Sequence, residues 1–178
     1  MDFKAEQKGV FIRMALAIIV TLSVIGYGYY ANPFGYEANL DFSQQVHAIS
    51  PFLICLVIPL MVSIGRQAGQ RFFSPSDIDS QNHSSASERS KNLQCMLQNT
   101  LEQTVLAILI YWLWMATMPA NYLSCLAIAS LLFLLGRILF ITGFMSGAVS
   151  RAFGFAITFY PSIALFLMIL IYGVTHSY

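Results

Sequence analysis

Charged side chains are scarce in this sequence. Of its 178 residues only 10% are Asp, Glu, Lys or Arg, whereas 57% are hydrophobic. Soluble domains carry about 25% charged residues, so this chain has too few of them to cover its surface in water. Its mean hydropathy of +0.67 agrees with this, and a net charge of +1 gives no electrostatic basis for binding nucleic acid. The composition indicates an integral membrane protein.

Cysteine and histidine are also rare, with three residues of each. Cys55, Cys95 and Cys125 lie far apart and form no C-x-x-C pair, so neither a disulfide framework nor a zinc site is expected. The histidines are isolated from one another, and no H-E-x-x-H motif occurs. Cysteines inside apolar segments are typical small packing residues. We therefore expect no metal site.

Five apolar stretches are long enough to cross a bilayer, which takes about 20 residues in a helix. A β-barrel would instead show short strands of alternating polarity. No charged residue occurs between Gln103 and Gly136, and the turn at Met118–Tyr122, with its Pro and Asn, divides that run into two helices. The sequence predicts an all-α integral membrane protein with spans at about Val10–Tyr30, Ala48–Gly65, Leu101–Met118, Tyr122–Phe144 and Ala152–Val174.

The first span follows Lys4, Lys8 and Arg13, as the core of a signal peptide would. Its apolar run is longer than the roughly 7–15 residues of such a core. The candidate cleavage site before Asn32 also has the bulky Tyr29 where a small residue is required. We expect this segment to remain as an uncleaved helix.

The basic residues predict the orientation of the chain. They precede the first span, are missing from the connection at 31–45, and return in a Ser-rich loop at about 67–92 that follows Arg66 and holds Arg71, Arg89 and Lys91. The positive-inside rule therefore places the N-terminus and this loop in the cytoplasm and the C-terminus outside. We expect a multi-pass protein of a bacterial inner membrane.

Three charged residues, Glu102, Arg137 and Arg151, lie inside or at the edge of apolar spans. Such residues cost on the order of 2.5–3.5 kcal/mol at the centre of a membrane, so they usually face the bundle interior and pair. With the predicted orientation they share the cytoplasmic level with Arg66. The arrangement favours either a buried Glu–Arg clamp that holds the bundle together or a site for a small anionic molecule.

Helical periodicity groups other polar residues around this charge. At 100° per residue, one face of the third span carries Gln94, Cys95, Gln98, Asn99 and Glu102. A second face, at positions i, i+3 and i+7 of the fourth span, carries Arg137, Phe140 and Phe144. Because arginines outnumber the carboxylate, a guest with carboxylates of its own would suit the site.

Two segments, SKNLQCMLQNTLEQTV and LGRILFITGFMSGAVSRAFGFAITFYP, resemble the MAPEG family of membrane proteins in eicosanoid and glutathione metabolism. The resemblance covers about Ala48–Val174 and leaves the first helix without a counterpart. It implies an extra N-terminal transmembrane helix at 1–46 and a MAPEG-like four-helix bundle at 47–178. It also implies a homotrimer that binds glutathione between subunits near the cytosolic face.

The resemblance assigns roles to single residues. Arg151 matches the arginine that stabilises the glutathione thiolate in conjugating members, and is the expected catalytic residue. Asn99 and Glu102 match an Asn-x-x-Glu pair that contacts the tripeptide. The full set of residues expected to bind glutathione is Arg66, Gln98, Asn99, Glu102, Arg137 and Phe144.

The chain also departs from the family pattern. Cys95 stands where members often have an arginine, and Gln103, Phe140 and Phe144 stand where tyrosines are seen. Each lost hydrogen bond removes roughly 0.5–3 kcal/mol.

Three function classes follow from these residues. The first is a glutathione-dependent transferase or peroxidase whose lipophilic electrophile enters from the bilayer between helices lined by Phe140, Phe144 and Phe155. The second is a non-catalytic membrane module that binds lipid or a partner protein. A small transporter is disfavoured, because the sequence has no inverted repeat and no paired broken helices.

Overall fold

The computed structural model describes residues 3–78 and 86–176. In these ranges the chain is helical and contains no strand, and its five long helices are each apolar enough to cross a membrane. The prediction of an all-α membrane protein with five spans is confirmed. The helices are α1 (Phe3–Ala31), α2 (Phe42–Phe73), α3 (Glu88–Thr117), α4 (Leu123–Gly143) and α5 (Ala148–His176), with short 3-10 turns η1 (Ala120–Tyr122) and η2 (Phe144–Ser146).

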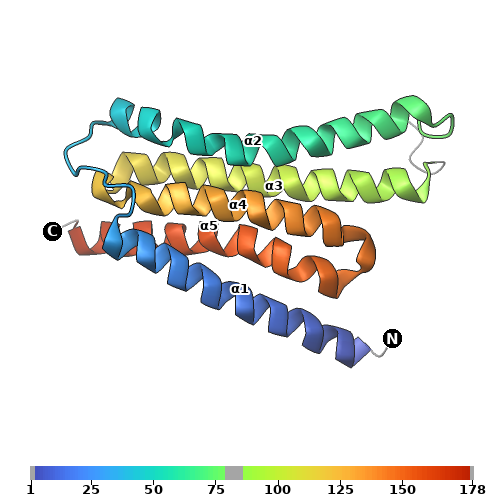
Figure 1. The fold of residues 1–178 in the computed structure, drawn as a ribbon, viewed down its shortest axis with the longest axis horizontal. Helices are drawn as coiled ribbons and strands as arrows, with labels where there is room; N and C mark the ends of the chain where they lie inside the picture. The colour runs from blue at the N-terminus through green and yellow to red at the C-terminus, as the bar shows by residue number, and fades with distance from the viewer. Residues whose placement is uncertain (1–2, 79–85, 177–178) are drawn as a thin grey trace.

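The helices lie side by side, and each long helix runs in the direction opposite to the one before it in the chain (Figure 1). The helix α4 is the most buried, and it packs against α5 on one side and α2 on the other. The helix α3 pairs with α2, and α1 lies across α5 and also contacts α4. The N-terminal helix is therefore part of the bundle and not a separate anchor.

The connection between α2 and α3 is shorter than the loop expected at about 67–92. The helix α2 continues to Phe73, and α3 already begins at Glu88. Ser87 caps α3 by accepting a hydrogen bond from the backbone N–H of Ser90. Asp77 then ties the two ends together, because its carboxylate accepts from Gln70 Nε2 at 2.9 Å and from both the N–H and the hydroxyl of Ser87 at 2.7 Å.

Two prolines, Pro51 and Pro59, lie inside α2, and each lacks the backbone N–H that an ordinary helical residue donates. Pro51 has no N–H to offer to the carbonyl of His47, so that carbonyl would lack its helical donor. The hydroxyl of Ser50 donates to it instead, at 2.9 Å. Such local replacement is how membrane helices tolerate proline.

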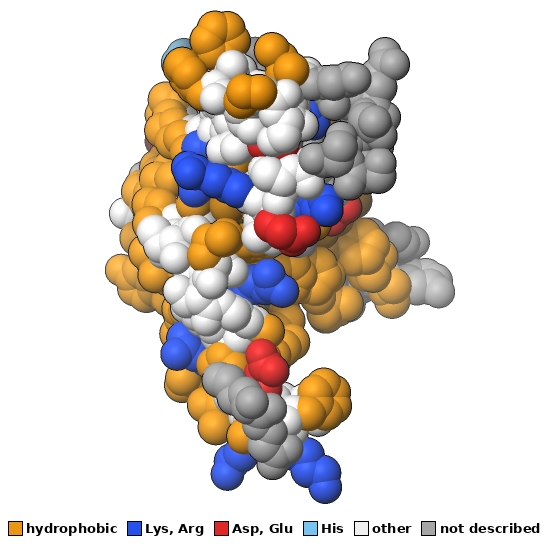
Figure 2. Space-filling view, turned by 90° about the vertical axis from the view of Figure 1, so that its right-hand side faces the viewer, with side chains coloured by type: hydrophobic (Ala, Val, Ile, Leu, Met, Phe, Trp, Pro, Cys, Tyr) orange, Lys and Arg blue, Asp and Glu red, His pale blue; other side chains and the backbone are white. Residues whose placement is uncertain are grey.

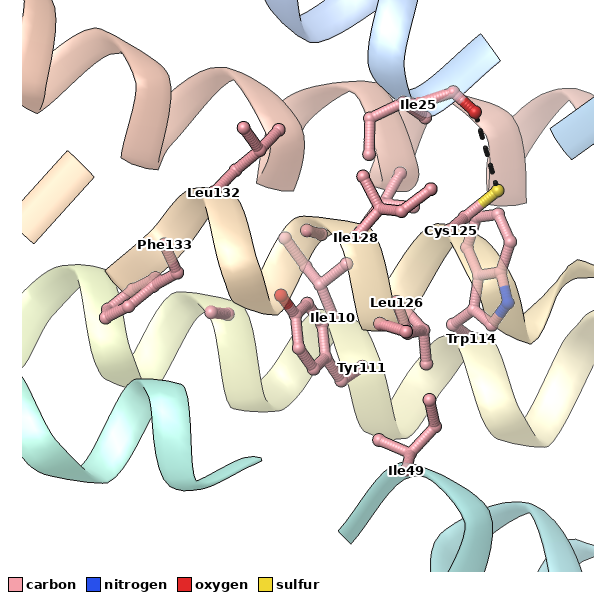
Figure 3. Packing of buried hydrophobic residues seen from close by; sticks show 14 of the residues in the cluster. Ile25, Ile49, Ile110, Tyr111, Trp114, Cys125, Leu126, Ile128, Leu132 and Phe133 are labelled. Carbon is pink, nitrogen blue, oxygen red and sulfur yellow. Dashed lines mark hydrogen bonds between the residues drawn. The ribbon is translucent and has the colours of Figure 1, made fainter. Parts of the chain in front are cut away.

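The main hydrophobic core lies in the half of the bundle away from the N-terminus. Trp114 of α3 and Leu126 of α4 are buried there, together with Ile49 from α2 and Ile25 from α1 (Figure 3). Leu165 from α5 is fully buried in the same cluster. Close packing of such side chains is what distinguishes the protein interior from the lipid around it. Five helices therefore meet in one core.

The C-terminal part of α1 is held by several specific contacts. The thiol of Cys125 in α4 donates to the carbonyl of Ile25 at 3.7 Å (Figure 3). The hydroxyl of Ser124 donates to Asn32 Oδ1 at 2.6 Å, just beyond the end of α1. The rings of Tyr29 and Tyr122 stack with centroids 4.3 Å apart. These contacts fix α1 to α4 at this end of the bundle.

The backbones of α4 and α5 approach one another closely at two glycines. A Cβ atom on Gly154 would collide with the N–H of Phe140 and lie 2.8 Å from the carbonyl oxygen of Gly136. A Cβ on Gly136 would collide with the hydroxyl of Thr158. Small residues at such crossings are typical of membrane helix pairs. The crossing brings the arginine-bearing ends of α4 and α5 side by side.

The nine Lys and Arg residues all lie toward the end of the bundle that carries the N-terminus. They occupy the start of α1, α3 and α5 and the final part of α2 and α4. Figure 2 views this end and shows basic side chains spread from α2 at the top to α1 at the bottom. The opposite connection, between α1 and α2, carries the acidic residues Glu37 and Asp41. We call the first of these ends the basic end.

Candidate functional site

The candidate site lies near the basic end, where α3, α4 and α5 meet. The helix α3 has 30 residues and is therefore about 45 Å long. Its first three turns extend past the apolar part of the bundle, so Glu102 lies near the middle of α3 and not at its beginning. The polar face expected on the third span is present along this extended segment.

Arg137 is completely buried in α4, and neutral groups hold it. Its Nη1 donates to Asn99 Oδ1 at 2.9 Å, and its Nε donates to Thr158 Oγ1 at 3.2 Å. The guanidinium carbon lies 4.5 Å from the ring centroid of Phe140, a distance that permits a cation–π interaction. The remaining nitrogen, Nη2, is buried without a hydrogen-bond partner among the described residues. Asn99 and Arg137 therefore act as one unit that joins α3 to α4.

Arg151 opens α5 beside the same helices and is partly buried. Its guanidinium carbon lies 4.8 Å from the ring centroid of Phe144 in η2. A cavity of about 410 Å³ separates this arginine from α3. Its lining residues are Val10, Met14, Cys95, Asn99, Phe140, Phe144, Ala148, Arg151, Ala152 and Phe155. The predicted residues Asn99, Phe144 and Arg151 thus line one cavity, as do the three expected phenylalanines.

Glu102 is not part of this cavity. Its carboxylate is exposed and accepts a hydrogen bond from Gln98 Nε2 at 2.9 Å, and no arginine pairs with it among the residues that the structure describes. The Glu–Arg clamp therefore does not form within one chain, because Asn99 and not Glu102 faces Arg137 across the α3–α4 contact. Gln98 and Glu102 both point away from the bundle.

Arg66 lies in a different depression, on the other side of α3. A cavity of about 510 Å³ between α2 and α3 is lined by Arg66, Gln70 and Arg89 among others. The contact of the Arg66 guanidinium is weak, 3.9 Å from Nη1 to the sulfur of Met96. Within one chain Arg66 and Arg151 therefore do not face the same cavity.

Several residues at the site could not be found from the sequence. Val10 and Met14 reach the cavity from α1, and Thr158 contacts Arg137 from α5. Their pattern in sequence is that of ordinary lipid-facing or packing residues, and only the helix arrangement brings them to the site. Within residues 3–78 and 86–176, no three His, Cys, Asp or Glu side chains gather in a way that would hold a metal ion.

Comparison with known proteins agrees with the resemblance seen in the sequence. The sequence model of the MAPEG family matches residues 46–171, which comprise α2 to α5 almost completely. The helix α1 lies outside the matched range, as expected for an additional N-terminal helix. No curated protein and no solved structure matches the chain.

Proposed function

The chain belongs to the MAPEG family, and from this premise we propose that it is a glutathione-dependent transferase or peroxidase for lipophilic electrophiles at the cytosolic face of a membrane. Membership in the family supports membrane chemistry of the glutathione or eicosanoid type. The observation that carries the more specific proposal is the cavity in which Arg151 and Asn99 face three phenylalanine rings. This cavity combines the Arg151 cation and the Asn99 amide with phenylalanine rings that an apolar reactant can contact.

The residues of the cavity suit glutathione. A volume of about 410 Å³ lies within the roughly 300–1,000 Å³ of small-molecule sites. Asn99 uses its amide oxygen to hold Arg137, which leaves its amide NH₂ available to a carbonyl or carboxylate of the tripeptide. Arg137 does not line the cavity, but its buried guanidinium adds positive charge behind Asn99. A peptide with two carboxylates fits this excess of donors.

Glutathione supplies the thiol that attacks the electrophile. Arg151 favours the thiolate form, because a guanidinium stabilises a neighbouring negative charge most strongly where water is excluded. In the transfer reaction the thiol proton leaves to solvent and the sulfur forms a bond to the electrophilic carbon. In an addition to an α,β-unsaturated carbonyl the electron pair of the C=C bond takes up a proton from solvent at the α-carbon, and in a substitution the leaving group departs with the electron pair of its bond to carbon. Phe140, Phe144 and Phe155 hold the apolar reactant against this sulfur.

A homotrimer with the site between subunits would complete the set of residues. Within the described residues of one chain Glu102 has no basic partner. It lies about one helical turn further into the membrane-spanning part of α3 than Asn99, which contacts Arg137. An exposed carboxylate at that depth is costly in lipid. A neighbouring subunit against α3 would cover Glu102 and bring its own Arg66 toward the cavity. The basic end would then face the cytoplasm, as the positive-inside rule requires.

The proposal is tested by mixing the protein in lipid nanodiscs with glutathione and recording thiolate absorbance and conjugation of a lipophilic electrophile. Arg151→Ala should abolish the thiolate band and reduce turnover far more than it weakens glutathione binding, and Arg151→Lys should restore part of both. Arg13→Ala is the matched control, since Arg13 is exposed on α1 and lines neither cavity described above.

A second candidate, a non-catalytic module that binds lipid or a partner protein, is favoured by the loss of hydroxyl groups from the cavity. Phe140 and Phe144 present rings without a hydroxyl, and Cys95 is a weak donor. If the unmodified protein gives neither a thiolate band nor turnover with any of several electrophiles, the enzyme proposal is wrong and this module takes its place.

A further inference from the structure

The helix α1 lies outside the range matched by the family, yet it forms a wall of the candidate cavity. Val10 and Met14 line the cavity opposite Asn99 and Arg151. The two side chains are four residues apart and therefore lie one above the other on the same face of α1. The extra helix thus contributes directly to the shape of the site.

A second cavity continues the first along α1. It measures about 560 Å³ and is lined by Phe3, Glu6, Gln7, Val10, Phe11, Met14 and Ala148. Val10, Met14 and Ala148 line both cavities, so the two form one groove. From Phe3 to Met14 the groove follows eleven residues of helix, about 16 Å. Apart from Glu6 and Gln7 near the first turn, the walls of the second cavity are apolar.

The width of this groove is set by how α1 is held. At Gly9 the helix touches the beginning of α5, where an added Cβ atom would lie 3.1 Å from both methyl groups of Val149. The hydrogen bond and ring stacking described above hold the other end of α1, around Asn32 and Tyr29. The helix therefore stays close to α5 at Gly9, and the second cavity lies alongside this contact.

We propose that α1 determines the specificity of the site, with Val10 and Met14 holding the unbranched apolar tail of the electrophile while its reactive end lies beside Arg151. The proposal rests on the proposed function for the identity of the reaction. The substrate class follows from the shape: an electrophilic carbon, such as that of an α,β-unsaturated carbonyl, at the end of a linear alkyl chain.

Cys95 provides a test that needs no glutathione. Its exposed thiol lines the same cavity, whereas Cys55 is partly buried and Cys125 is fully buried. The protein in nanodiscs is treated with N-ethylmaleimide or N-dodecylmaleimide, and peptide mass spectrometry follows alkylation of Cys95 separately from the other two. A dodecyl tail in the groove delivers its maleimide to Cys95, so the unmodified protein should favour the long reagent.

Two tryptophan variants of α1 separate a groove effect from partitioning of the reagent into lipid. Met14→Trp fills the groove and should lower the dodecyl-to-ethyl rate ratio about tenfold. Leu16→Trp adds the same side chain at an exposed position outside both cavities and should keep the ratio of the unmodified protein. Met14→Ala should preserve or raise the ratio.

The outcomes distinguish this inference from the proposed function. An unchanged ratio in Met14→Trp, or an equal fall in both rates, would show that the tail does not lie along α1 and would overturn the inference. The labelling result does not depend on whether glutathione binds or reacts. With a groove confirmed by labelling, failure of glutathione turnover would count against the reaction alone.

Discussion

Arg137 is a fully buried cation whose direct partners are neutral. The Asn99 amide, the Thr158 hydroxyl and the face of Phe140 each satisfy part of the guanidinium. A carboxylate in the place of Asn99 would cancel the charge, whereas an amide leaves the positive charge of Arg137 uncompensated behind the cavity. The Arg137–Asn99 hydrogen bond also links α3 to α4 at this point.

Replacement of Asn99 by leucine should strongly destabilise the protein. Arg137 would lose its shortest hydrogen bond, and a hydrogen bond to a charged group typically contributes about 1.5–3 kcal/mol. Asn99→Asp should be much less damaging, because a carboxylate accepts the same hydrogen bond. The measurement is the thermal unfolding midpoint in detergent. Equal midpoints for the leucine variant and the unmodified protein would contradict the role given to this bond.

The sequence predicted that Glu102, Arg137 and Arg151 share one level with Arg66, but it could not predict which residues at that level pair. Helical periodicity gives the face on which a side chain lies. It does not give the rotation of one helix against another, and a turn of α3 separates Asn99 from Glu102. That rotation depends on packing, including the contact of Thr158 with Arg137 from a third helix.

At the scale of the helices, the crossing of α4 and α5 positions both arginines of the site. Gly154→Ala should separate the two backbones and destabilise the bundle, since the added methyl group has no room beside Phe140 and Gly136. Overpacking of this kind costs typically 1–3 kcal/mol. Gly26→Ala is the control, because a Cβ at Gly26 in α1 meets nothing within 4 Å. Thermal unfolding of both variants gives the comparison, and equal midpoints would count against a close crossing.

The Asp77 contact gives the α2–α3 connection a pH dependence. Hydrogen bonds from Gln70 and from the backbone and hydroxyl of Ser87 hold the pKa of this carboxyl well below its usual range. A lowered pKa in the folded state adds stability above the unfolded value of about 3.9, and this stability is lost as the pH falls further. Asp77→Asn should therefore lower the unfolding temperature at pH 7, with the difference shrinking below about pH 4.

The exposed Glu88 provides the control for this measurement. Glu88→Gln also removes a carboxylate near the start of α3, but it breaks only a surface ion pair with Lys91 at 3.2 Å. Such pairs contribute little, so its unfolding temperature should stay close to that of the unmodified protein. A gap between Asp77→Asn and the unmodified protein that persists at low pH would show that the carboxylate charge is not the cause.

The existence of the five helices could be predicted from hydropathy, but their ends could not. Apolar length marks the part of a helix inside lipid. The helix α3 begins at Glu88, well before its apolar segment, because Ser87 caps it and Asp77 anchors that cap to α2. Such contacts join residues from different helices and leave no periodic signal in the sequence.

At the scale of the whole molecule, we expect three chains to assemble. Native mass spectrometry in mild detergent should give a homotrimer. Glu102→Gln should weaken it, because the exposed carboxylate of α3 is the charge that a basic residue of a neighbouring subunit would meet. The fold of each chain should survive, since Glu102 contacts only Gln98 of its own helix. Spectra that contain only monomers would exclude a site shared between subunits.

The position of the nine basic residues at one end has a consequence for how the protein responds to the membrane potential. Moving one elementary charge across a membrane against 100 mV costs about 2.3 kcal/mol. The seven basic residues of α1, α2 and α3 outnumber the three acidic ones, Glu6, Glu88 and Glu102, so an inverted chain would incur this cost for the net positive charge of these helices on an energised membrane. A potential that is negative on the basic side therefore opposes inversion of the inserted chain. Dissipating the potential would remove this opposition without changing any contact inside the bundle.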